Sequence, residues 1–207
     1  MPEAFRNYLA VLGWGPSDGV EIRPVDEIVE RFRLEDVVPS PAHFDTKKLD
    51  HFNGEYIRLL PTEAFTDRAR PWLGDRADTD EWHLLAPLVQ ERVVTLSEVP
   101  SLVDFVFGDF EVDEESWEKA MKSPAAAVLE AALEALARAE WEPDALHEAM
   151  RKVADAHGVK LKQAQAPVRV AVMGRTVGLP LFDSLPVVGR ELSLERMRQA
   201  RERLARE

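Results

Sequence analysis

The sequence contains no cysteine, so disulfides, zinc–thiolate centres and cysteine nucleophiles are excluded from its chemistry. Long apolar runs are also absent, because none approaches the roughly 18–20 residues of a membrane-spanning helix. The N-terminus lacks the charged and then apolar pattern of a secretory signal peptide. With 45% hydrophobic and 31% charged residues, the composition is that of a folded protein. We therefore expect a cytoplasmic protein with no membrane partner.

Positive charge is scarce as well. The chain carries 26 Lys and Arg against 38 Asp and Glu, a net charge of −12. A basic surface supplies much of the affinity for nucleic acid, so this balance argues against such a partner. The distribution of charge weakens that argument. Acid is concentrated in residues 108–118, whereas base gathers in residues 150–163 and 196–206 and at Arg169 and Arg175, so a basic face beside an acidic one remains compatible with the sequence.

Groups that could carry out catalysis are missing too. No pair among the five histidines has the spacing of metal ligands on a helix. The carboxylates of "EVDEESWEK" (111–119) stand in a polar stretch that indicates a solvated turn. The glycines of "MGRTVG" (173–178) are not followed by the Lys-Ser/Thr of a phosphate-binding loop. The residues themselves thus predict no catalytic residue, no metal and no cofactor site.

Helical patterns cover most of the chain and predict an all-α fold. Apolar residues recur at three- and four-residue spacing in "PEAFRNYLAVLG" (2–13). Residues 79–93 are expected to be helical despite Pro87, which would kink the helix or end it. The clearest helix is "SPAAAVLEAALEALARAE" (123–140), for which we expect Ser123 as N-cap and Pro124 as the first helical residue.

The stretch "PVRVAVMG" (167–174) fits two structures. Its valines stand at every second position, as in a strand, and β-branched side chains favour one. The same letters fit a short helix that begins at Pro167 and ends at Gly174. The residues alone leave both structures open.

Several stretches carry a family resemblance. One is "PEAFRNYLAVLGW" (2–14), and a more specific one is "FDTKKLDHFNGEYIR" (44–58), which matches F-D-x-x-K-L-x-x-x-N-G-x-Y-I-R. A third is the segment 157–191, with a proline-led helix, a glycine and a P-L-F turn. In this order, from residue 2 to about residue 195, they resemble the C-terminal half of bacterial glutamyl-tRNA synthetases.

The resemblance implies an architecture. Residues 1–60 would form a helical stem-contact region, and residues 61–104 and 105–207 the two subdomains of an α-helical cage that binds the anticodon. It also implies that residues 167–174 form the helix from Pro167 to Gly174 rather than a strand.

The resemblance also bears on activity. The family's HIGH and KMSKS motifs, which hold ATP and activate glutamate, do not occur in the sequence. We expect the chain to be inactive alone, either as a fragment of a glutamate–tRNA ligase or as a stand-alone relative that binds tRNA. The parent enzyme would use ATP and Mg²⁺ in the missing catalytic domain. The implied partners are tRNA-Glu and that catalytic domain, and we expect a monomer.

The stretch "RVVTLSEVP" (92–100) matches the family's R-x-x-T-L-x-E-x-P pattern, which implies that Arg92 reads the third anticodon base. That base is C in glutamate tRNAs and G in glutamine tRNAs. A guanidinium can donate to the carbonyl and the ring nitrogen of cytosine, whereas guanine presents a donor there. The resemblance therefore implies an enzyme that discriminates against tRNA-Gln.

The other anticodon bases are assigned to the closing turn. There, backbone groups of Gly178 and Leu179 would contact bases, Leu181 would offer a stacking surface, and Arg169 would make a second base contact. The alternative is that Leu181 and Phe182 are plain core residues. Ala166 replaces a glutamine of the family, which leaves contacts to the first anticodon base open.

The 44–58 signature contributes two further tRNA contacts. Lys48 and Arg58 would bind phosphate or sugar, and Asn53-Gly54 between them would break the helix so that the backbone can approach a partner. A different class of function is also open. The net charge of −12 and Ala166 fit a helical protein-interaction module that kept this fold and lost RNA binding.

Overall fold

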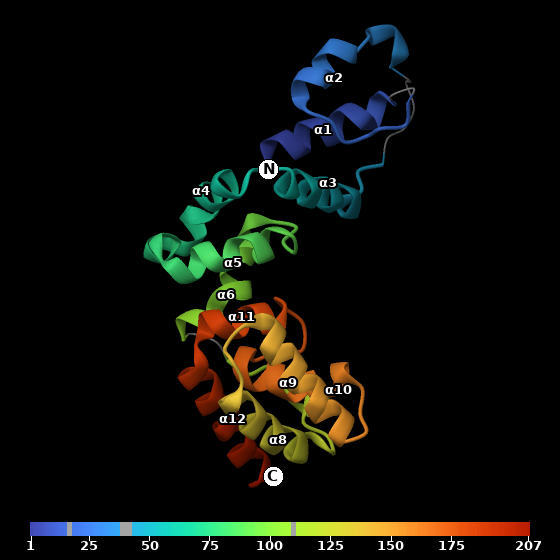
Figure 1. Ribbon diagram of the computed structural model, residues 1–207. Coiled ribbons are helices and arrows are strands. Elements are labelled where there is room, and N and C mark those ends of the chain that lie inside the picture. The colour runs from blue at the N-terminus through green and yellow to red at the C-terminus, as the bar shows by residue number, and fades with distance from the viewer. Residues whose placement is uncertain (16–17, 38–42, 109–110) are drawn as a thin grey trace. The chain divides into compact units, whose positions relative to one another are not determined.

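The computed structural model describes residues 1–15, 18–37, 43–108 and 111–207. Throughout these ranges every regular element is a helix and no strand occurs, which confirms the all-α prediction. The elements, drawn in Figure 1, are α1 (Pro2–Gly13), α2 (Val25–Arg31), η1 (Leu34–Asp36), α3 (Thr46–Arg58), α4 (Thr62–Leu73), η2 (Gly74–Asp78), α5 (Asp80–Gln90), η3 (Leu96–Glu98), α6 (Val99–Phe107), α7 (Glu114–Ala120), α8 (Ala125–Arg138), α9 (Pro143–Ala156), α10 (Leu161–Met173), α11 (Leu181–Val188) and α12 (Arg190–Leu204).

The chain forms two compact units. The first comprises Met1–Asp78 and Ala86–Pro100, and the second comprises Thr79–Leu85 and Ser101–Glu207. Helices α5 and α6 thus contain residues of both units. The division into 1–60, 61–104 and 105–207 stays a prediction.

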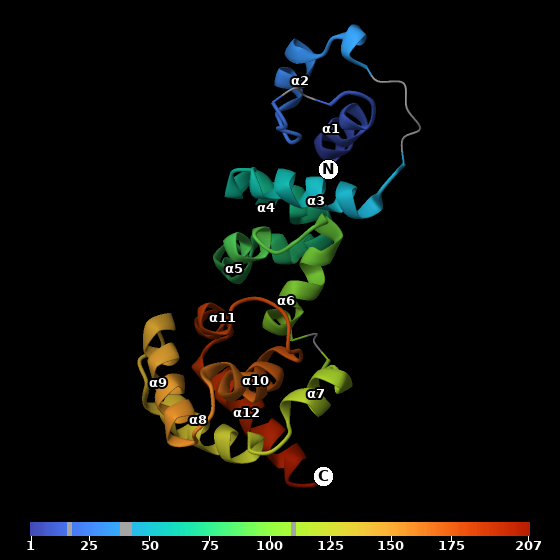
Figure 2. The same ribbon diagram turned by 90° about the vertical axis from the view of Figure 1, so that its right-hand side faces the viewer.

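One core cluster of the first unit lies between α1 and α3, which pack against each other in Figure 2. The rings of Tyr8 and Phe52 meet edge to face, with centroids 5.7 Å apart. Both side chains are 1% exposed, and Ala4 and Tyr56 complete the buried cluster. Burying a side chain of this size contributes about 1.5–3 kcal/mol. Because the helical spacing of residues 2–13 places Ala4 and Tyr8 on one face, this burial holds α1 against α3.

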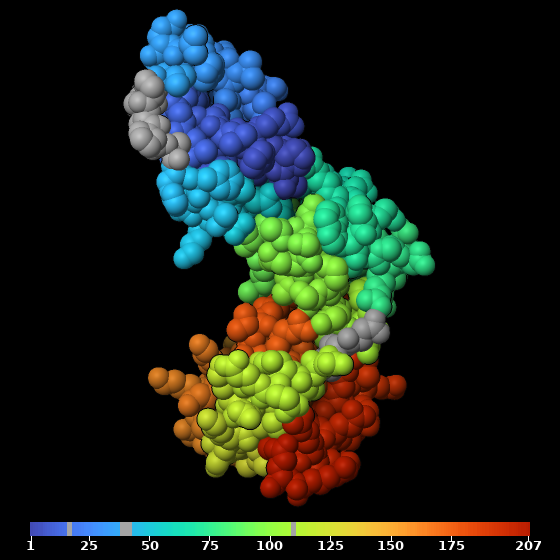
Figure 3. All heavy atoms as spheres, turned by 180° about the vertical axis from the view of Figure 1, so that it is seen from behind, coloured from blue at the N-terminus to red at the C-terminus, as the bar shows by residue number. Residues whose placement is uncertain are grey.

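The second unit is a group of packed helices in which α8 contacts α9 and α12, and α10 contacts all three. Its largest fully buried side chains come from these helices, from α6 and from the start of α5, and include Trp82, Leu85, Phe105, Leu129, Leu136, Leu146, Met150 and Met173. The space-filling view shows the surface of α7 and α8, in yellow-green, bordering the red surface of α12 (Figure 3). This core carries α10 and the loop that follows it.

Residues 167–174 are helical, as the resemblance implied, and the strand alternative is wrong. The helix ends where expected, because Gly174 takes the left-handed conformation with φ of 76°. The expected start at Pro167 is wrong, since α10 begins six residues earlier at Leu161. The side-chain oxygen of Gln163 accepts a hydrogen bond of 3.0 Å from the backbone N–H of Lys160, which caps this earlier start. Pro167 is buried inside the helix, where packing outweighs its missing N–H.

Two further predictions concern a proline inside α5 and the N-cap of α8. Helix α5 forms as expected but runs from Asp80 to Gln90, so it continues through Pro87, which does not end it. The cap predicted for the alanine-rich helix is wrong, because α8 begins at Ala125 and its N-cap is Pro124 rather than Ser123. In the described part of the chain, no helix combines the length and the apolar character that a membrane span needs.

Candidate nucleic-acid interface

Arg92 lies in the first unit, in the turn between α5 and η3, and is exposed. Its backbone N–H donates to the carbonyl of Val89 at 2.9 Å, so the turn itself is closed. Its side chain makes no hydrogen bond or ion pair with any residue that the structure describes. The guanidinium is therefore available to a partner outside the chain.

The backbone next to Arg92 is held firmly. The carboxylate of Glu98 accepts from the N–H of Val94 at 3.2 Å and from the N–H of Thr95 at 3.1 Å. On the other side, the amide of Asn53 donates to the carbonyl of Val94. Both polar groups of the Val94 residue are thus bonded, and Val93 beside it is fully buried. The glutamate of the T-L-x-E-x-P pattern fixes the loop that carries the guanidinium.

The contact with Asn53 corrects a prediction. Helix α3 is continuous from Thr46 to Arg58, so the helix break expected at Asn53-Gly54 is wrong. Asn53 uses its side chain to bind the Val94 loop rather than to make a turn. At Gly54, an added Cβ would lie 3.2 Å from Nη2 of Arg58, so the missing side chain makes room for that guanidinium.

In the second unit, α10 contributes Arg169, and the structure brings it to the predicted turn. Its Nη1 donates to the carbonyl of Leu179 at 2.6 Å. Leu179 is fully buried, and Leu181, the first residue of α11, is only 2% exposed. In this conformation Leu181 packs in the core, which is the alternative stated for it, and a base could stack on it only if the turn opened.

The loop between α10 and α11 is anchored near its start. The carbonyl of Gly174 accepts from the N–H of Asp113 at 2.9 Å, and the N–H of Thr176 donates to Oγ of Ser116 at 3.1 Å. Arg175 bonds the carboxylate of Asp104 and the carbonyl of Ser101. Each of these partners comes from a neighbouring element of the same unit.

Asp113 also caps α7, since its carboxylate accepts from the N–H of Ser116 at 2.8 Å. Hydrogen bonding from Ser116 lowers the pKa of Asp113 and keeps its carboxylate charged.

The tip of this loop is Val177 and Gly178. The side chain of Val177 is 80% exposed, and within the described ranges neither N–H group donates a hydrogen bond. Sequence reasoning assigned Gly178 but missed Val177. The sequence did contain a sign of this exposure, because Val177 is an apolar residue in a stretch that ends in glycine and belongs to no helical apolar face. An exposed apolar side chain beside open donors suits contact with an unstacked base.

Lys48 and Arg58 both have partners within the chain. Nζ of Lys48 lies 2.7 Å from a carboxylate oxygen of Glu21 and 5.8 Å from the ring centre of Phe52. Nη2 of Arg58 lies 2.6 Å from Glu55, one turn earlier on α3. All these side chains except Phe52 remain partly exposed, so the two cations are accessible but already paired.

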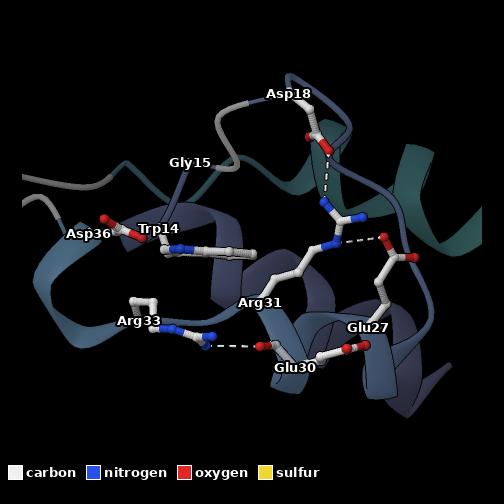
Figure 4. A pocket seen from close by; sticks show the side chains of 8 residues that line it. All are labelled: Trp14, Gly15, Asp18, Glu27, Glu30, Arg31, Arg33 and Asp36. Atoms are coloured by element: carbon white, nitrogen blue, oxygen red, sulfur yellow. Dashed lines mark hydrogen bonds and ion pairs between the residues drawn. The ribbon is translucent and has the colours of Figure 1, made fainter.

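The first unit also contains a hollow that is poorly suited to binding RNA. It measures about 920 Å³ and is drawn in Figure 4. Arg31 in its wall bonds Asp18 and Glu27, at 3.1 and 2.9 Å, and Arg33 donates to the carbonyl of Glu30. Its lining residues are Trp14, Gly15, Asp18, Glu27, Glu30, Arg31, Arg33 and Asp36. With four carboxylates against two engaged arginines, this hollow would repel phosphate. Among the described residues, no cluster of three or more His, Cys, Asp or Glu could hold a metal ion.

Comparison with known proteins places these features in a family. The family model described as an anticodon binding domain matches residues 64–201. The chain belongs to the anticodon-binding domain family. Both loops of this anticodon-binding domain, around Arg92 and around Gly178, fall inside the matched range, whereas Lys48 and Arg58 precede it.

Relatives with known names agree. The chain is 52% identical over 216 residues to the glutamate–tRNA ligase of Thermobifida fusca and 49% identical over 213 residues to that of Frankia casuarinae. Both alignments cover 99% of this chain and 45% of the ligase. The chain therefore spans less than half the length of these relatives, and it corresponds to their C-terminal part.

Solved structures give the same result. The crystal structure of a glutamate tRNA ligase from Elizabethkingia meningosepticum, in complex with its amino acid, matches with a TM-score of 0.82 at 27% identity. The match covers 98% of this chain and 41% of that one. A glutamate-tRNA synthetase from Elizabethkingia anophelis matches with a TM-score of 0.79 at 26% identity. The chain thus shares its fold with about two fifths of each of these solved ligases, at low sequence identity.

Proposed function

We propose that this chain is the tRNA-recognition portion of a cytoplasmic, monomeric glutamate–tRNA ligase and that Arg92 selects tRNA-Glu against tRNA-Gln. One observation carries the proposal: an unpaired, exposed guanidinium stands on a backbone that Asn53 and Glu98 hold. The whole ligase would charge tRNA with glutamate using ATP and Mg²⁺ in its catalytic domain. The identity of about 50% to two glutamate–tRNA ligases supports this assignment.

The chemistry of Arg92 follows from its donors. A guanidinium has only donors, in a planar fork, and cytosine offers a carbonyl oxygen and a ring nitrogen side by side as acceptors. Guanine offers a ring N–H at the equivalent edge, so one donor would face another. A matched bidentate contact of this kind discriminates by about 1–3 kcal/mol. The held backbone reduces the conformational entropy that the loop would lose on binding.

The loop between α10 and α11 would contact the other anticodon bases. The open N–H groups of Val177 and Gly178 supply donors, and the side chain of Val177 supplies apolar surface. Arg169 would act mainly by holding Leu179 in place. The boundaries 1–60, 61–104 and 105–207 are proposed as the stem-contact region and the two anticodon-binding subdomains.

Lys48 and Arg58 would contact the tRNA backbone by exchanging Glu21 and Glu55 for phosphate. Exposed ion pairs contribute only about 0–1 kcal/mol, so the exchange costs little. Such contacts position the RNA but carry no sequence information.

The test is binding of the 207-residue chain to transcripts of tRNA-Glu and tRNA-Gln at low salt. We expect wild type to prefer tRNA-Glu and Arg92→Gln to lose that preference. Arg6→Gln is the matched control, because Arg6 is also exposed and unpaired within the described residues. Equal affinity of wild type for both tRNAs, left unchanged by Arg92→Gln, would refute the role of Arg92.

A protein-interaction module is the second candidate, and the internal pairing of Lys48 and Arg58 with carboxylates favours it. The two candidates differ in their response to salt. An RNA-binding chain retains tRNA at ~50 mM salt, where phosphate contacts are strongest, and releases it as salt rises. A module that has lost RNA binding retains none at either concentration.

A further inference from the structure

Helix α7 lies at the edge of the second unit, as Figure 2 shows. It packs against α10, and side chains link it to the end of α12. Glu114 and Trp117 stand three residues apart on α7, so they share one helical face. Arg203 and Glu207 stand four residues apart at and just after the end of α12, and this spacing brings them together as well. The two pairs meet in the folded chain.

These four side chains, which we call the Trp117 cluster, are bonded to one another. Nη2 of Arg203 lies 2.6 Å from a carboxylate oxygen of Glu114, and its Nε lies 3.0 Å from Glu207. The guanidinium carbon lies 4.0 Å from the ring centre of Trp117, which is the geometry of a cation–π contact. The indole N–H of Trp117 donates to the carboxylate of Glu207, with 3.1 Å to each oxygen. Because Trp117 is only 4% exposed, this carboxylate satisfies a largely buried donor.

The charges of the Trp117 cluster support one another. Hydrogen bonds from Trp117 and Arg203 lower the pKa of Glu207, so its carboxylate is ionised at neutral pH. Hydrogen bonding to Glu114 raises the pKa of Arg203. Since Arg203 and Glu207 are partly exposed, each ion pair alone contributes little to stability. Their effect is instead on the position of α7, because both of them contact Trp117.

The neighbouring face of α7 holds the loop between α10 and α11. There, Oγ of Ser116 accepts a hydrogen bond of 3.1 Å from the N–H of Thr176. Ser116 directly precedes Trp117, so a displacement of Trp117 also displaces this acceptor. Thr176 directly precedes Val177, the exposed tip of the loop. The contacts therefore form a continuous path from Glu207 to that tip.

We propose that Glu207 is a positioning residue for RNA binding: together with Arg203 it fixes Trp117, and α7 then holds the loop between α10 and α11 in the conformation that meets the anticodon. The proposal rests on the proposed function, which assigns this loop to the anticodon. Glu207 itself contacts no RNA. A loop that is already held loses less conformational entropy on binding. Loss of the Trp117 cluster therefore lowers affinity for both tRNAs alike, because the choice between C and G is assigned to Arg92.

The first measurement needs no RNA. Glu207→Ala removes the acceptor of the indole N–H, and we expect the amide N–H of Thr176 to exchange with solvent roughly two- to fivefold faster than in wild type, the scale of one exposed ion pair. Exchange at the buried Val168, inside α10, should stay unchanged, whereas a general loss of stability would speed it as well. Glu202→Ala is the matched control, because it removes the same charge from α12 and its partner is Arg206. This control should leave exchange at Thr176 unchanged.

The second measurement connects the Trp117 cluster to RNA. Affinity of the 207-residue chain for tRNA-Glu and tRNA-Gln transcripts is compared for wild type, Glu207→Ala, Ser116→Ala and the double variant. We expect Glu207→Ala to weaken binding of both tRNAs by roughly two- to fivefold, with the ratio between them unchanged. Because Glu207 acts through Ser116, the double variant should bind no more weakly than Ser116→Ala alone. Additive losses would show that Glu207 acts by another route and would overturn the proposal.

The outcomes distinguish this proposal from the proposed function. If Thr176 exchanges at the wild-type rate in Glu207→Ala, the positioning role is refuted and the role of Arg92 is unaffected. If wild type binds no tRNA, the proposed function fails together with the RNA-binding part of this proposal, while exchange at Thr176 still decides whether Glu207 holds the loop. Circular dichroism checks the fold of each variant. Should Glu207→Ala unfold, Arg203→Gln removes the other support of the indole ring and decides by the same two measurements.

Discussion

The two proposed RNA-contacting loops use opposite arrangements. In the first unit, the backbone around Val94 is bonded on both sides by Asn53 and Glu98, and the side chain of Arg92 is left open. In the second unit, the side chain of Arg169 is itself bonded to a backbone carbonyl, and the backbone of Val177 and Gly178 is left open. The first loop therefore presents the side chain of Arg92 on a bonded backbone. The second loop presents backbone N–H groups, and the side chain of Arg169 bonds its backbone.

This difference separates two kinds of recognition. A guanidinium distinguishes bases by their acceptors, so the first loop is suited to choosing between C and G. Backbone donors and a small apolar surface accept many bases, so the second loop is suited to affinity. Substitutions in the first loop should change preference, and substitutions in the second should change affinity for both tRNAs alike.

The largest expected effect concerns the support of the second loop. Arg196 on α12 is 8% exposed, and its Nη1 donates to the carbonyls of Phe105 at 2.7 Å and of Val172, near the end of α10, at 2.9 Å. Burial lowers its pKa, but a guanidinium stays charged. Arg196→Ala leaves both buried carbonyls without this hydrogen-bond donor. We therefore expect a loss of about 2–4 kcal/mol in the free energy of unfolding by urea. The exposed Arg198→Ala should change it by less than about 0.5 kcal/mol. Equal effects of the two variants would show that α12 does not support this loop.

The next effect tests the backbone of the first loop. Glu98→Ala removes the acceptor for the N–H groups of Val94 and Thr95, and we expect a loss of about 1–2 kcal/mol in stability. The freed loop no longer positions Arg92, so the preference for tRNA-Glu should weaken as well. Glu91→Ala removes the same charge from an exposed neighbour and should change neither quantity. A stable Glu98→Ala variant with full preference would mean that the loop needs no support.

Much of the fold was predictable because helical periodicity is a local signal. The burial of Tyr8 and Phe52 follows from apolar spacing, and the end of α10 at Gly174 follows from the left-handed conformation that glycine accepts. The start of α10 was missed because Pro167 is a strong local signal for a helix start. The hydrogen bond from the N–H of Lys160 to the side chain of Gln163 marks the earlier start, and it was not predicted from the sequence.

The candidate site was less predictable, since its contacts are distant in sequence. Asn53-Gly54 is a typical turn dipeptide, yet Asn53 bonds Val94, 41 residues later, and stays helical. Nor could the sequence tell that Leu181 is buried while Val177 is exposed, because both are apolar residues in one Pro/Gly-rich stretch. The family resemblance supplied the candidate RNA-contacting residues. Three-dimensional packing decides which of their side chains are exposed to a partner.

A third prediction sharpens the contrast between the loops. Arg169→Gln removes the hydrogen bond to Leu179 at the base of the second loop. Because we propose that this loop supplies affinity rather than choice between C and G, we expect roughly tenfold weaker binding of both tRNAs with the ratio between them unchanged. The measurement is filter retention of both transcripts at one salt concentration. A change in the ratio would place third-base discrimination in the second unit.

The smallest effect is expected at the tip. Val177→Ser should leave the free energy of unfolding within about 0.5 kcal/mol of wild type, because a side chain that is 80% exposed buries little on folding. Affinity for both tRNAs should fall slightly through the loss of apolar contact. A stability loss above about 1 kcal/mol would show that Val177 is packed and unavailable to RNA.

The central claim is that Arg92 itself reads the third anticodon base, and a double-mutant cycle tests it most directly. The cycle combines Arg92→Gln with a tRNA-Glu transcript whose third anticodon base is changed from C to G, and measures Kd for all four pairs. We predict a coupling energy of about 1–3 kcal/mol, with wild type losing affinity on the base change and the variant indifferent to it. Additive effects of the two changes would contradict the account.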